Sequence, residues 1–246
     1  MSNISPIDGR YKKNVSELET FFSEQALMRH RVMVEVEYLL ALIEHRSFQK
    51  TRALSKKTLN SLKGLYVEFS ADHFKQIKKI EKKTNHDVNA VVVFVSEKLK
   101  KLGRGDLVPF VHFGLTSEDI NNISYSLMTQ GAVEDVMIPS VKRVLKELKA
   151  LSKKTKSLSL LSLTHGQPAT TTTLGKELTV FVSRVEREIA LIEKIKLLAK
   201  LSGATGSYAA HKVAFPDFNW PLFSKRFIKK LGLEQSPIST QVEPGD

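Results

Sequence analysis

Three long stretches of the chain repeat apolar residues at the spacing of one helix face, and this pattern limits the possible folds more than any other feature. They cover residues 18–44, 141–151 and 174–200. In the last stretch the apolar steps alternate mostly between four and three residues, which is typical of a helix packed along a seam. A helix of that length would be about twice the average in soluble proteins. We therefore expect long helices that pack together as a bundle.

Signals for β-strands are weak, so the predicted fold class is all-α. No Asn-Gly or Asp-Gly turn joins two strand-like runs in this sequence. Only the apolar run at residues 90–95 suggests a strand. Its neighbours, Asp87 on one side and the charged residues 97–101 on the other, instead favour the two ends of one helix.

Gly, Pro, Ser and Thr gather at three places where helices are expected to end. These breaks lie at residues 103–109, 163–173 and 201–219. The first break separates a basic N-terminal part from the helical stretches that follow. We therefore expect an N-terminal helical domain over residues 1–108 and, over residues 109–246, the start of a central helical bundle that this chain leaves incomplete.

The chain carries a formal net charge of +12, and such an excess raises the local concentration of anionic partners. Between residues 50 and 104, 14 Lys and Arg stand against 5 Asp and Glu. A solvated helix surface explains any single cluster, such as Lys78-Lys79. A basic helical module that binds nucleic acid is one alternative function. However, most Phe residues lie on apolar faces and no recognition-helix signature is present, so we expect no nucleic acid partner.

The sequence also indicates where the protein is found. Its apolar runs are far shorter than the ~20 residues that cross a bilayer, so we expect no membrane partner. The first twenty residues lack the apolar core of a secretory signal. The chain has no cysteine, which excludes disulfides and thiolate metal sites and favours a cytoplasmic location.

Three short polar segments interrupt the helical pattern, each where a new helix is expected to begin. They are Thr84-Asn85-His86-Asp87, His112-Phe113-Gly114-Leu115-Thr116-Ser117-Glu118-Asp119 and Thr164-His165-Gly166-Gln167-Pro168-Ala169-Thr170. Asn85 or Asp87 is expected to cap the helix that starts near Val88, and Thr116 with Asp119 resembles a capping box. Helix starts also present free N–H groups to a phosphate or carboxylate.

Helix capping does not explain the histidines of these segments, because imidazole is a poor N-cap. His86, His112 and His165 therefore become candidates for function. They fall in no short metal-ligand spacing such as HExxH, and no cysteine is available. We expect neither a metal nor any other cofactor.

Together with two further motifs, these segments resemble a known family, the bacterial adenylosuccinate lyases of the fumarase/aspartase superfamily. Five motifs follow one another in the order and spacing of that family. They are Asp8-Gly9-Arg10-Tyr11, Thr84-Asn85-His86-Asp87, Thr116-Ser117-Glu118-Asp119-Ile120-Asn121-Asn122, Thr164-His165-Gly166-Gln167-Pro168-Ala169-Thr170 and Gln241-Val242-Glu243-Pro244. The resemblance implies an all-helical protein built around a long bundle, and homotetramers in which three subunits form each active site.

The resemblance also implies a reaction, the β-elimination of fumarate from adenylosuccinate and from succinyl-aminoimidazole-carboxamide ribotide in purine nucleotide biosynthesis. An elimination needs a base for the carbon-bound proton and an acid for the departing nitrogen. His165 matches the general acid of the family. His86, between Asn85 and Asp87, matches the histidine that contacts the substrate and supports that acid, with Asp87 expected to orient it. His112 matches a further histidine near the site.

Other motif residues match positions that bind the nucleotide substrate. Arg10 and Tyr11 match residues that bind its phosphate, for which a guanidinium is well suited. Thr116 and Ser117 match a turn that binds a succinyl carboxylate. Gln241 matches a glutamine that contacts the substrate.

The sequence departs from the family in one large respect. No segment resembles the Ser-Ser-x-Met-Pro-x-Lys-x-Asn-Pro loop, which supplies the serine taken as the general base, nor the rest of the bundle and the C-terminal domain. Gly245 stands where close relatives are expected to have histidine. We therefore expect a truncated, inactive chain. Argininosuccinate lyase or fumarase, which share the elimination chemistry, is a further alternative.

Overall fold

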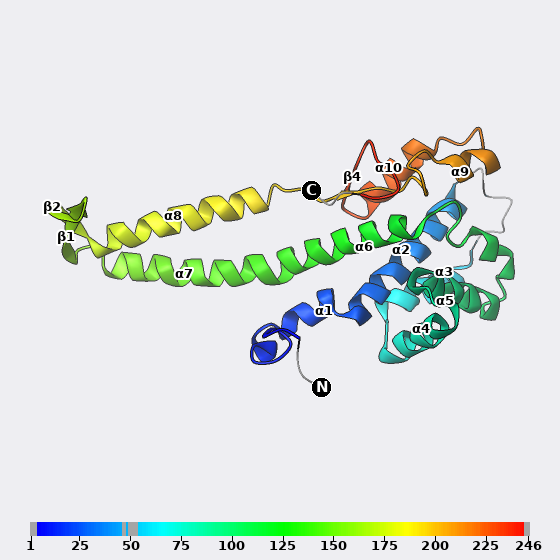
Figure 1. Cartoon of the computed structure of the whole chain (residues 1–246), viewed down its shortest axis with the longest axis horizontal. Helices are drawn as coiled ribbons and strands as arrows, with labels where there is room; N and C mark the ends of the chain where they lie inside the picture. The colour runs from blue at the N-terminus through cyan, green and yellow to red at the C-terminus, as the bar shows by residue number, and fades with distance from the viewer. Residues whose placement is uncertain (1–3, 46–47, 49–53, 244–246) are drawn as a thin grey trace. The chain divides into compact units, whose positions relative to one another are not determined.

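The chain folds mainly into α-helices, as a computed structural model that describes residues 4–45, 48 and 54–243 shows (Figure 1). The helices are α1 (Glu19–Phe22), α2 (Glu24–Glu44), α3 (Lys56–Val67), α4 (Ala71–Thr84), α5 (Asp87–Lys101), α6 (Ser117–Ala132), α7 (Ile138–Lys154), α8 (Leu174–Ile192), α9 (Ala209–Ala214) and α10 (Trp220–Lys230). The strands are β1 (Ser159–Thr164), β2 (Gln167–Thr173), β3 (Leu198–Ala199) and β4 (Glu234–Gln235). The helical fold class is confirmed, with these short strands in addition.

The chain divides into two compact units. Unit 1 consists of Met1–Gln130 and Leu197–Asp246, and unit 2 is Gly131–Lys196. Residues on both sides of the expected domain boundary after residue 108 lie in unit 1, and that boundary stays a prediction. Within the described parts of both units, no helix is both long and apolar enough to cross a membrane.

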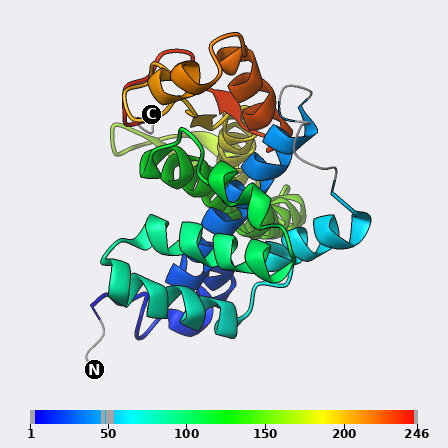
Figure 2. The same ribbon diagram turned by 90° about the vertical axis from the view of Figure 1, so that its right-hand side faces the viewer.

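Helix α2 is the central element of unit 1. Apolar side chains on one of its sides pack with α3, α4 and α5, and those on the other side pack with the start of α6 and with α10. Figures 1 and 2 show these two groups of helices on either side of α2. Since α2 is covered on both sides, it has no single apolar face, and its buried residues include the charged Arg31, Glu35 and Glu37 as well as apolar side chains.

The helix expected over residues 18–44 is interrupted at Ser23, so that part of the prediction is wrong. Ser23 is extended, with ψ at 158°, and its side chain accepts a hydrogen bond from the N–H of Ala26 at 3.1 Å. The serine therefore caps α2 and separates it from α1. A serine cap of this kind stabilises a helix by about 1 kcal/mol.

Unit 2 is built from the helical pair α7 and α8 (Figure 1). Their facing side chains form a small apolar core around Leu145, Val182 and Ile189. Lys149 and Glu186 form an ion pair between the two helices at 2.5 Å.

The helix expected over residues 174–200 is shorter than predicted. Helix α8 ends at Ile192, and residues 198–199 form strand β3, which pairs with β4 in parallel.

The segment around His165 is a β-hairpin, where the sequence suggested a helix start. Strands β1 and β2 pair antiparallel with an irregularity between Leu161 and Leu163. The two residues of the turn, His165 and Gly166, have φ angles of 51° and 75°. Positive φ at both central residues matches the right-handed twist of a hairpin and is usually supplied by Asn-Gly.

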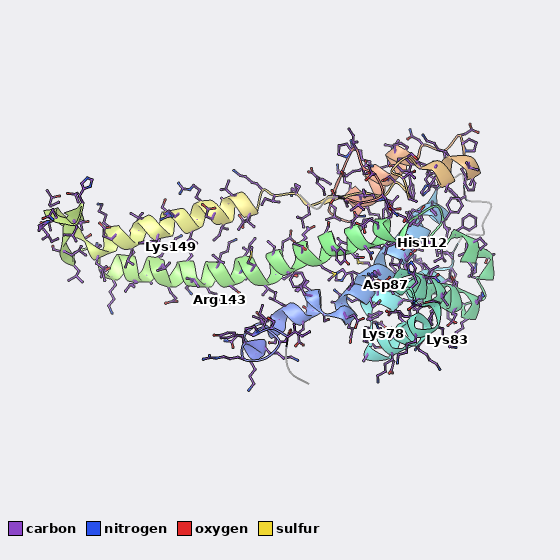
Figure 3. All side chains as sticks on the ribbon, in the orientation of Figure 1. Lys78, Lys83, Asp87, His112, Arg143 and Lys149 are labelled. Carbon is purple, nitrogen blue, oxygen red and sulfur yellow. The ribbon has the colours of Figure 1, made fainter. Side chains whose placement is uncertain are left out.

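Part of the positive charge is neutralised within unit 1. Lys78, which Figure 3 labels on α4, contacts Glu24 at 2.7 Å and Glu81 at 2.8 Å. Arg31, Lys63 and Lys230 also pair with carboxylates. These contacts favour a solvated, ion-paired helix surface as the explanation of the basic clusters.

Candidate active site

Positive φ angles mark the candidate segments. Among the described residues other than glycine, they occur at Asn85, His112, His165 and Tyr208, with values between 50° and 58°. The left-handed conformation costs such residues about 1–2 kcal/mol each. Three of the four lie in the polar segments selected from the sequence. Backbone strain of this kind is often found at functional sites, because the surrounding structure must hold it in place.

His86 itself is the N-cap of α5, which corrects the expectation that Asn85 or Asp87 performs this role. The His86 Nδ1 accepts a hydrogen bond from the N–H of Asn89 at 3.2 Å, whereas Asn85 ends α4. Since Nδ1 accepts this bond, the neutral ring carries its proton on Nε2. Nε2–H is thereby left available for a ligand.

Asp87 forms an ion pair with a residue of the central helix. Its Oδ2 lies 2.7 Å from the Arg31 guanidinium, and its Oδ1 accepts from the Val88 N–H at 2.8 Å. Partial burial raises the pKa of Asp87, but the Val88 N–H and Arg31 outweigh this effect and hold it below the usual value. The Asp87 Oδ1 is 3.5 Å from His86 Nδ1, so capping contributes more directly to the orientation of the ring.

Arg31 also connects two of the motifs. While its terminal nitrogen binds Asp87, its Nε donates to Asn121 at 2.9 Å. Asn121 belongs to the motif that begins at Thr116, and the Arg31 side chain is only 3% exposed. A buried guanidinium with two fixed partners holds the start of α5 and the first turns of α6 at a defined spacing.

His112 contacts the same central helix one turn further along, and Figure 3 labels it together with Asp87. Its Nδ1 lies 2.6 Å from Oε1 of Glu35, a residue that is completely buried. Burial lowers the pKa of His112, but the hydrogen bond and charge of Glu35, with a smaller contribution from Asp119, outweigh it and raise that pKa above its usual value.

Asp119 fixes the turn that holds Thr116 and Ser117. Its buried carboxylate accepts hydrogen bonds from the backbone N–H groups of Thr116, Ser202 and Gly203 at 2.9–3.1 Å. It also pairs with the buried Lys200 ammonium at 2.9 Å. The sequence indicated a capping box between Thr116 and Asp119, and the hydrogen bond from the Thr116 N–H to the Asp119 carboxylate is one of its two bonds. This arrangement joins the start of α6 to a loop more than eighty residues away.

Two glycines let the same loop approach the His112 segment. Gly114 has a φ of +69°, and a Cβ placed there would lie 2.6 Å from the His211 ring. A Cβ on Gly203 would lie 3.1 Å from the Gly114 carbonyl oxygen. The backbones approach closely at Gly203, and the His211 ring fills the space that a side chain on Gly114 would occupy. Close approach of this kind is a common reason for glycine.

The remaining unit 1 candidates lie near the surface. Gln241 is exposed, and two residues later the backbone of Glu243 forms a hydrogen bond with the Glu118 carboxyl, which brings this segment to the start of α6. Pro244 and Gly245 lie outside the described residues. Arg10 and Tyr11 are exposed, with the guanidinium 5.6 Å from the Tyr11 ring centre.

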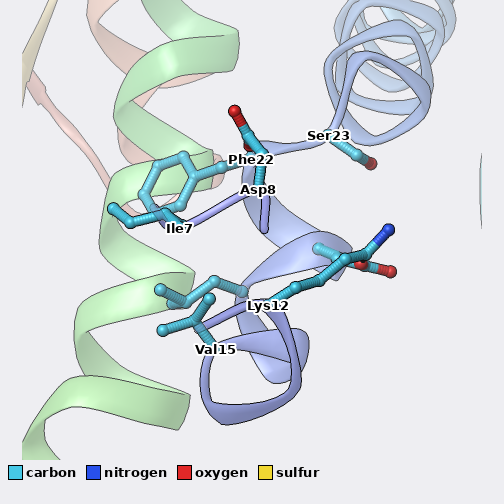
Figure 4. Close-up of a pocket in the computed structure, with 8 residues that line it drawn as sticks. Ile7, Asp8, Lys12, Val15, Phe22 and Ser23 are labelled. Atoms are coloured by element: carbon cyan, nitrogen blue, oxygen red, sulfur yellow. The ribbon is translucent and has the colours of Figure 1, made fainter. Parts of the chain in front are cut away.

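A groove of about 590 Å³ lies beside the first motif and is shown in Figure 4. It is lined by Ile7, Asp8, Lys12, Val15, Leu18, Glu19, Phe22 and Ser23. Its wall is mainly apolar, whereas Asp8, Lys12 and Glu19 add charges. Neither Arg10 nor Tyr11 lines this groove.

His165 belongs to unit 2, whereas the other candidates belong to unit 1. It lies at the tip of the β1–β2 hairpin, and its side chain is exposed. The structure thus brings the segments of His86, His112, Thr116 and Gln241 together in unit 1.

Sequence reasoning missed the buried charges that hold these segments. Arg31, Glu35 and Glu37 interrupt the apolar pattern of α2, and Lys200 stands within the apolar residues before Gly203. Charged residues are almost never buried without partners. The sequence did contain a signal for these buried charges, because each charged residue stands at a position where the helix pattern requires an apolar one. In the described part of the chain, no group of three or more His, Cys, Asp or Glu side chains is arranged to hold a metal ion.

A family model described as "Lyase" matches residues 9–246. The chain belongs to the lyase family. The predicted resemblance to adenylosuccinate lyases is confirmed by relatives of that name. This lyase-family chain is 42% identical over 249 residues to the enzyme of Buchnera aphidicola subsp. Schizaphis graminum, and 42% identical over 253 residues to that of Dictyostelium discoideum. The Escherichia coli K12 relative is 39% identical over 247 residues.

All three alignments cover 100% of this chain but 54% of the relative, so the chain spans about half the length of the curated relatives it matches. Two solved structures share the fold. A fumarate lyase from Mesorhizobium sp. BNC1 matches with a TM-score of 0.69 and 19% identity, over 91% of this chain and 49% of its own. A β-carboxy-cis,cis-muconate cycloisomerase from Acinetobacter calcoaceticus matches with a TM-score of 0.66 and 20% identity, over 91% of this chain and 50% of its own.

Proposed function

We propose that this chain supplies the N-terminal part of an adenylosuccinate lyase, which eliminates fumarate from adenylosuccinate and from succinyl-aminoimidazole-carboxamide ribotide. One observation carries the proposal. The segments that match the substrate-binding motifs of that family are held around α2 by buried ionic contacts, through Arg31 to Asp87 and through Glu35 to His112. The identity of about 40% to adenylosuccinate lyases supports it.

In this mechanism His165 protonates the nitrogen that leaves as fumarate is released. A histidine suits this step because its usual pKa lies near neutrality. The exposed hairpin tip presents the ring to a substrate bound elsewhere in the assembly. The neutral His86 ring contacts the substrate through Nε2–H and supports the acid. The base that removes the carbon-bound proton comes from a segment that the 246 residues do not contain.

The other candidates bind the substrate's anionic groups. Arg10, with Tyr11, binds the phosphate, because a guanidinium forms paired hydrogen bonds with phosphate oxygens. Thr116 and Ser117 bind a succinyl carboxylate at the start of α6, where the N–H groups and the helix dipole favour a negative charge. Asn85, His112 and Gln241 complete the contacts. By resemblance to the family we also propose a homotetramer with sites shared by three subunits, acting in AMP formation in the cytoplasm.

The proposal is tested by fusing this chain to the part of the Escherichia coli relative that follows the matched region. We expect the fusion to release fumarate and AMP from adenylosuccinate but to leave argininosuccinate unchanged. In the fusion, His165→Ala should lower kcat by about 10²–10⁴ with little effect on KM, because protonation of the leaving nitrogen is needed only in the transition state. Steady-state kinetics with chromatography of both products measures this.

Arg10→Ala is the variant to compare with His165→Ala, because it removes a charge proposed to bind the substrate phosphate and leaves the proposed proton donor in place. It should raise KM and make binding less sensitive to salt while kcat changes little. A fusion that turns over at the same kcat with and without His165 contradicts the assignment of the acid. A fusion that acts on argininosuccinate and not on adenylosuccinate contradicts the proposed substrate.

A further inference from the structure

Three buried ionisable residues on α2 have unequal surroundings. Arg31 is bound by Asp87 and Asn121. Glu37 accepts a hydrogen bond from the Tyr66 hydroxyl at 2.7 Å and pairs with Lys63 and Lys230 at 3.8 and 3.2 Å. The charges of both residues are therefore compensated by elements of the fold itself.

Glu35 lacks such compensation. Its side chain is 0% exposed, its Oε1 contacts only His112, and its Oε2 has no hydrogen-bond partner among the described residues. A buried carboxylate is costly unless a cation or several donors neutralise it. Among the described residues, the His112 ring is the only group in contact with the Glu35 carboxylate that can become a cation. An apolar residue at position 35 would therefore stabilise the fold at least as well as Glu35 does. The contact with His112 explains why a glutamate stands there.

The geometry at His112 determines which nitrogen remains for a ligand. Nδ1 is taken by Glu35 at 2.6 Å, and Nε2 makes no hydrogen bond within residues 4–45, 48 and 54–243. The His112 side chain is 21% exposed, so the ring reaches the surface. Its backbone is held at a φ of 57°, a conformation that a surface histidine without a role rarely adopts.

We propose that Glu35 is a positioning residue which holds His112 as an imidazolium, with Nδ1–H on the buried carboxylate and Nε2–H directed to an anionic oxygen of the substrate. The contact with substrate rests on the proposed function, whereas the state of the ring does not. Glutamine at position 35 would accept the same hydrogen bond from Nδ1–H. The negative charge is therefore the property that the proposal requires.

The other charges around the ring act in a definite direction. Asp119, from α6, also favours the imidazolium, but Lys200 binds this carboxylate at 2.9 Å and offsets its charge. Tyr38, on α2, is neutral, because burial and the nearby Asp119 and Glu35 raise its pKa well above its usual value. Glu35 is thus the uncompensated charge next to His112, and removing it should change the titration of the ring.

The test uses the 246-residue chain labelled with ¹⁵N in its histidines. The imidazole nitrogens report both tautomer and protonation, and the His112 signals are identified by their loss in His112→Gln. In the parent we expect both His112 nitrogens to stay protonated to a higher pH than in an ordinary histidine. In Glu35→Gln the midpoint should move to lower pH. The matched control is Glu37→Gln, which removes a buried carboxylate from the same helix and should leave the His112 midpoint unchanged.

The kinetic arm uses the fusion described above. Glu35→Gln should raise KM for adenylosuccinate, and this defect should grow as pH increases past the lowered His112 midpoint, while Glu37→Gln shows no such pH dependence. An unchanged His112 titration in Glu35→Gln overturns the proposal whether or not the fusion is active. A shifted titration with an unchanged pH profile of KM overturns the role toward substrate. A fusion without turnover contradicts the proposed function, and the imidazole spectra then decide the state of the ring.

Discussion

The imidazole of His211 illustrates how one residue can be constrained by its neighbours. The ring is fully buried and lies 4.5 Å from the Trp220 ring centre. The Tyr38 hydroxyl donates to the Phe113 carbonyl at 2.7 Å, so the contact of 3.3 Å between Tyr38 and His211 Nε2 requires that Nε2 carry the proton. His211 Nδ1 then has neither a proton nor a partner among the described residues. The ring is therefore neutral.

This neutral histidine predicts acid sensitivity. Burial lowers the pKa of His211 to about 4, although Asp119 acts in the opposite direction. The unfolded chain, with a histidine pKa of 6.5, then binds more protons than the native state between pH 6.5 and 4. Stability is complete above this window and falls as pH decreases through it. His211→Gln keeps a donor toward Tyr38 and should flatten the slope, as urea unfolding at several pH values measures.

Burial also lowers the pKa of His30 and of His73, so these two histidines act in the same direction and His211→Gln should remove only its own part of the slope. The remaining shifted groups act differently. The raised pKa of His112 contributes stability that is present below pH 6.5 and is lost as pH rises. Asp87 and Glu37, whose pKa values lie below the usual range, lose their contributions only at more acidic pH. An equally steep slope between pH 6.5 and 4 in parent and His211→Gln shows that this histidine does not control acid stability.

At the scale of elements, the sequence predicted which segments become helices better than where they end. The apolar spacing of α2, α7 and α8 was sufficient, because apolar residues at helical spacing form a continuous surface for burial, and the charged residues at both ends identified α5 as a helix. The break at Ser23 was missed because the apolar pattern continues across it. The β1–β2 hairpin was missed because His165-Gly166 is not a usual turn pair. The buried partners of the candidate site, such as Glu35, were missed because their contacts join distant segments.

The hairpin turn provides a direct test of its geometry. Gly166 has a φ of +75°, and no atom lies within 4 Å of a Cβ added there. Gly166→Ala should therefore cost about 1–2 kcal/mol from the backbone alone and increase hydrogen exchange of the β1 and β2 amides. Gly105→Ala is the matched control, since position 105 is equally open but its φ is not positive. Equal protection of the hairpin in Gly166→Ala and the parent contradicts the two-residue turn.

At the scale of the whole molecule, a buried ion pair joins parts of unit 1 that are distant in sequence. Lys200 Nζ binds Asp119 at 2.9 Å and the Gly203 carbonyl at 3.0 Å. The Asn122 side chain accepts from the Lys200 N–H at 2.9 Å and donates to its carbonyl at 3.0 Å. The start of α6 and the segment after β3 therefore form one structural element, although they are far apart along the chain.

Removing one member of this pair should strongly lower the free energy of unfolding. Lys200→Met leaves the buried Asp119 carboxylate without its cation, which typically costs about 3–5 kcal/mol. The free energy of unfolding from urea titration measures the loss. Lys212→Met, which makes the same substitution at an exposed position, should change it by less than about 0.5 kcal/mol. Similar values for both variants rule out a stabilising role for the buried pair.

The 246-residue chain by itself should release no measurable fumarate from adenylosuccinate. It contains the proposed acid, His165, but no segment that resembles the base-bearing loop, and both proton transfers serve one elimination. It should also self-associate through unit 2. The exposed apolar side chains there include Val144, Leu151, Val180, Phe181, Leu191 and Ile195. Chromatography of products and light scattering after size exclusion measure the two expectations.

Matched controls separate the two expectations. A reaction without protein gives the background of fumarate release, and turnover well above it shows that the base lies within these residues. Val144→Lys combined with Phe181→Lys should reduce self-association by placing charges on the apolar surface of unit 2. A parent chain that elutes as a stable monomer disagrees with the expected association.

The crossing of Gly114 and Gly203 constrains how this sequence can evolve. A methyl group at position 114 meets the His211 ring at 2.6 Å, so it can fit only after position 211 has become smaller, and the φ of +69° still opposes it. A smaller residue at position 211 leaves a void beside Trp220 but keeps the backbone path intact. Neutral drift through this region therefore has a preferred direction, in which residue 211 changes first. The effect of a substitution at 114 depends on the genetic background in which it arises.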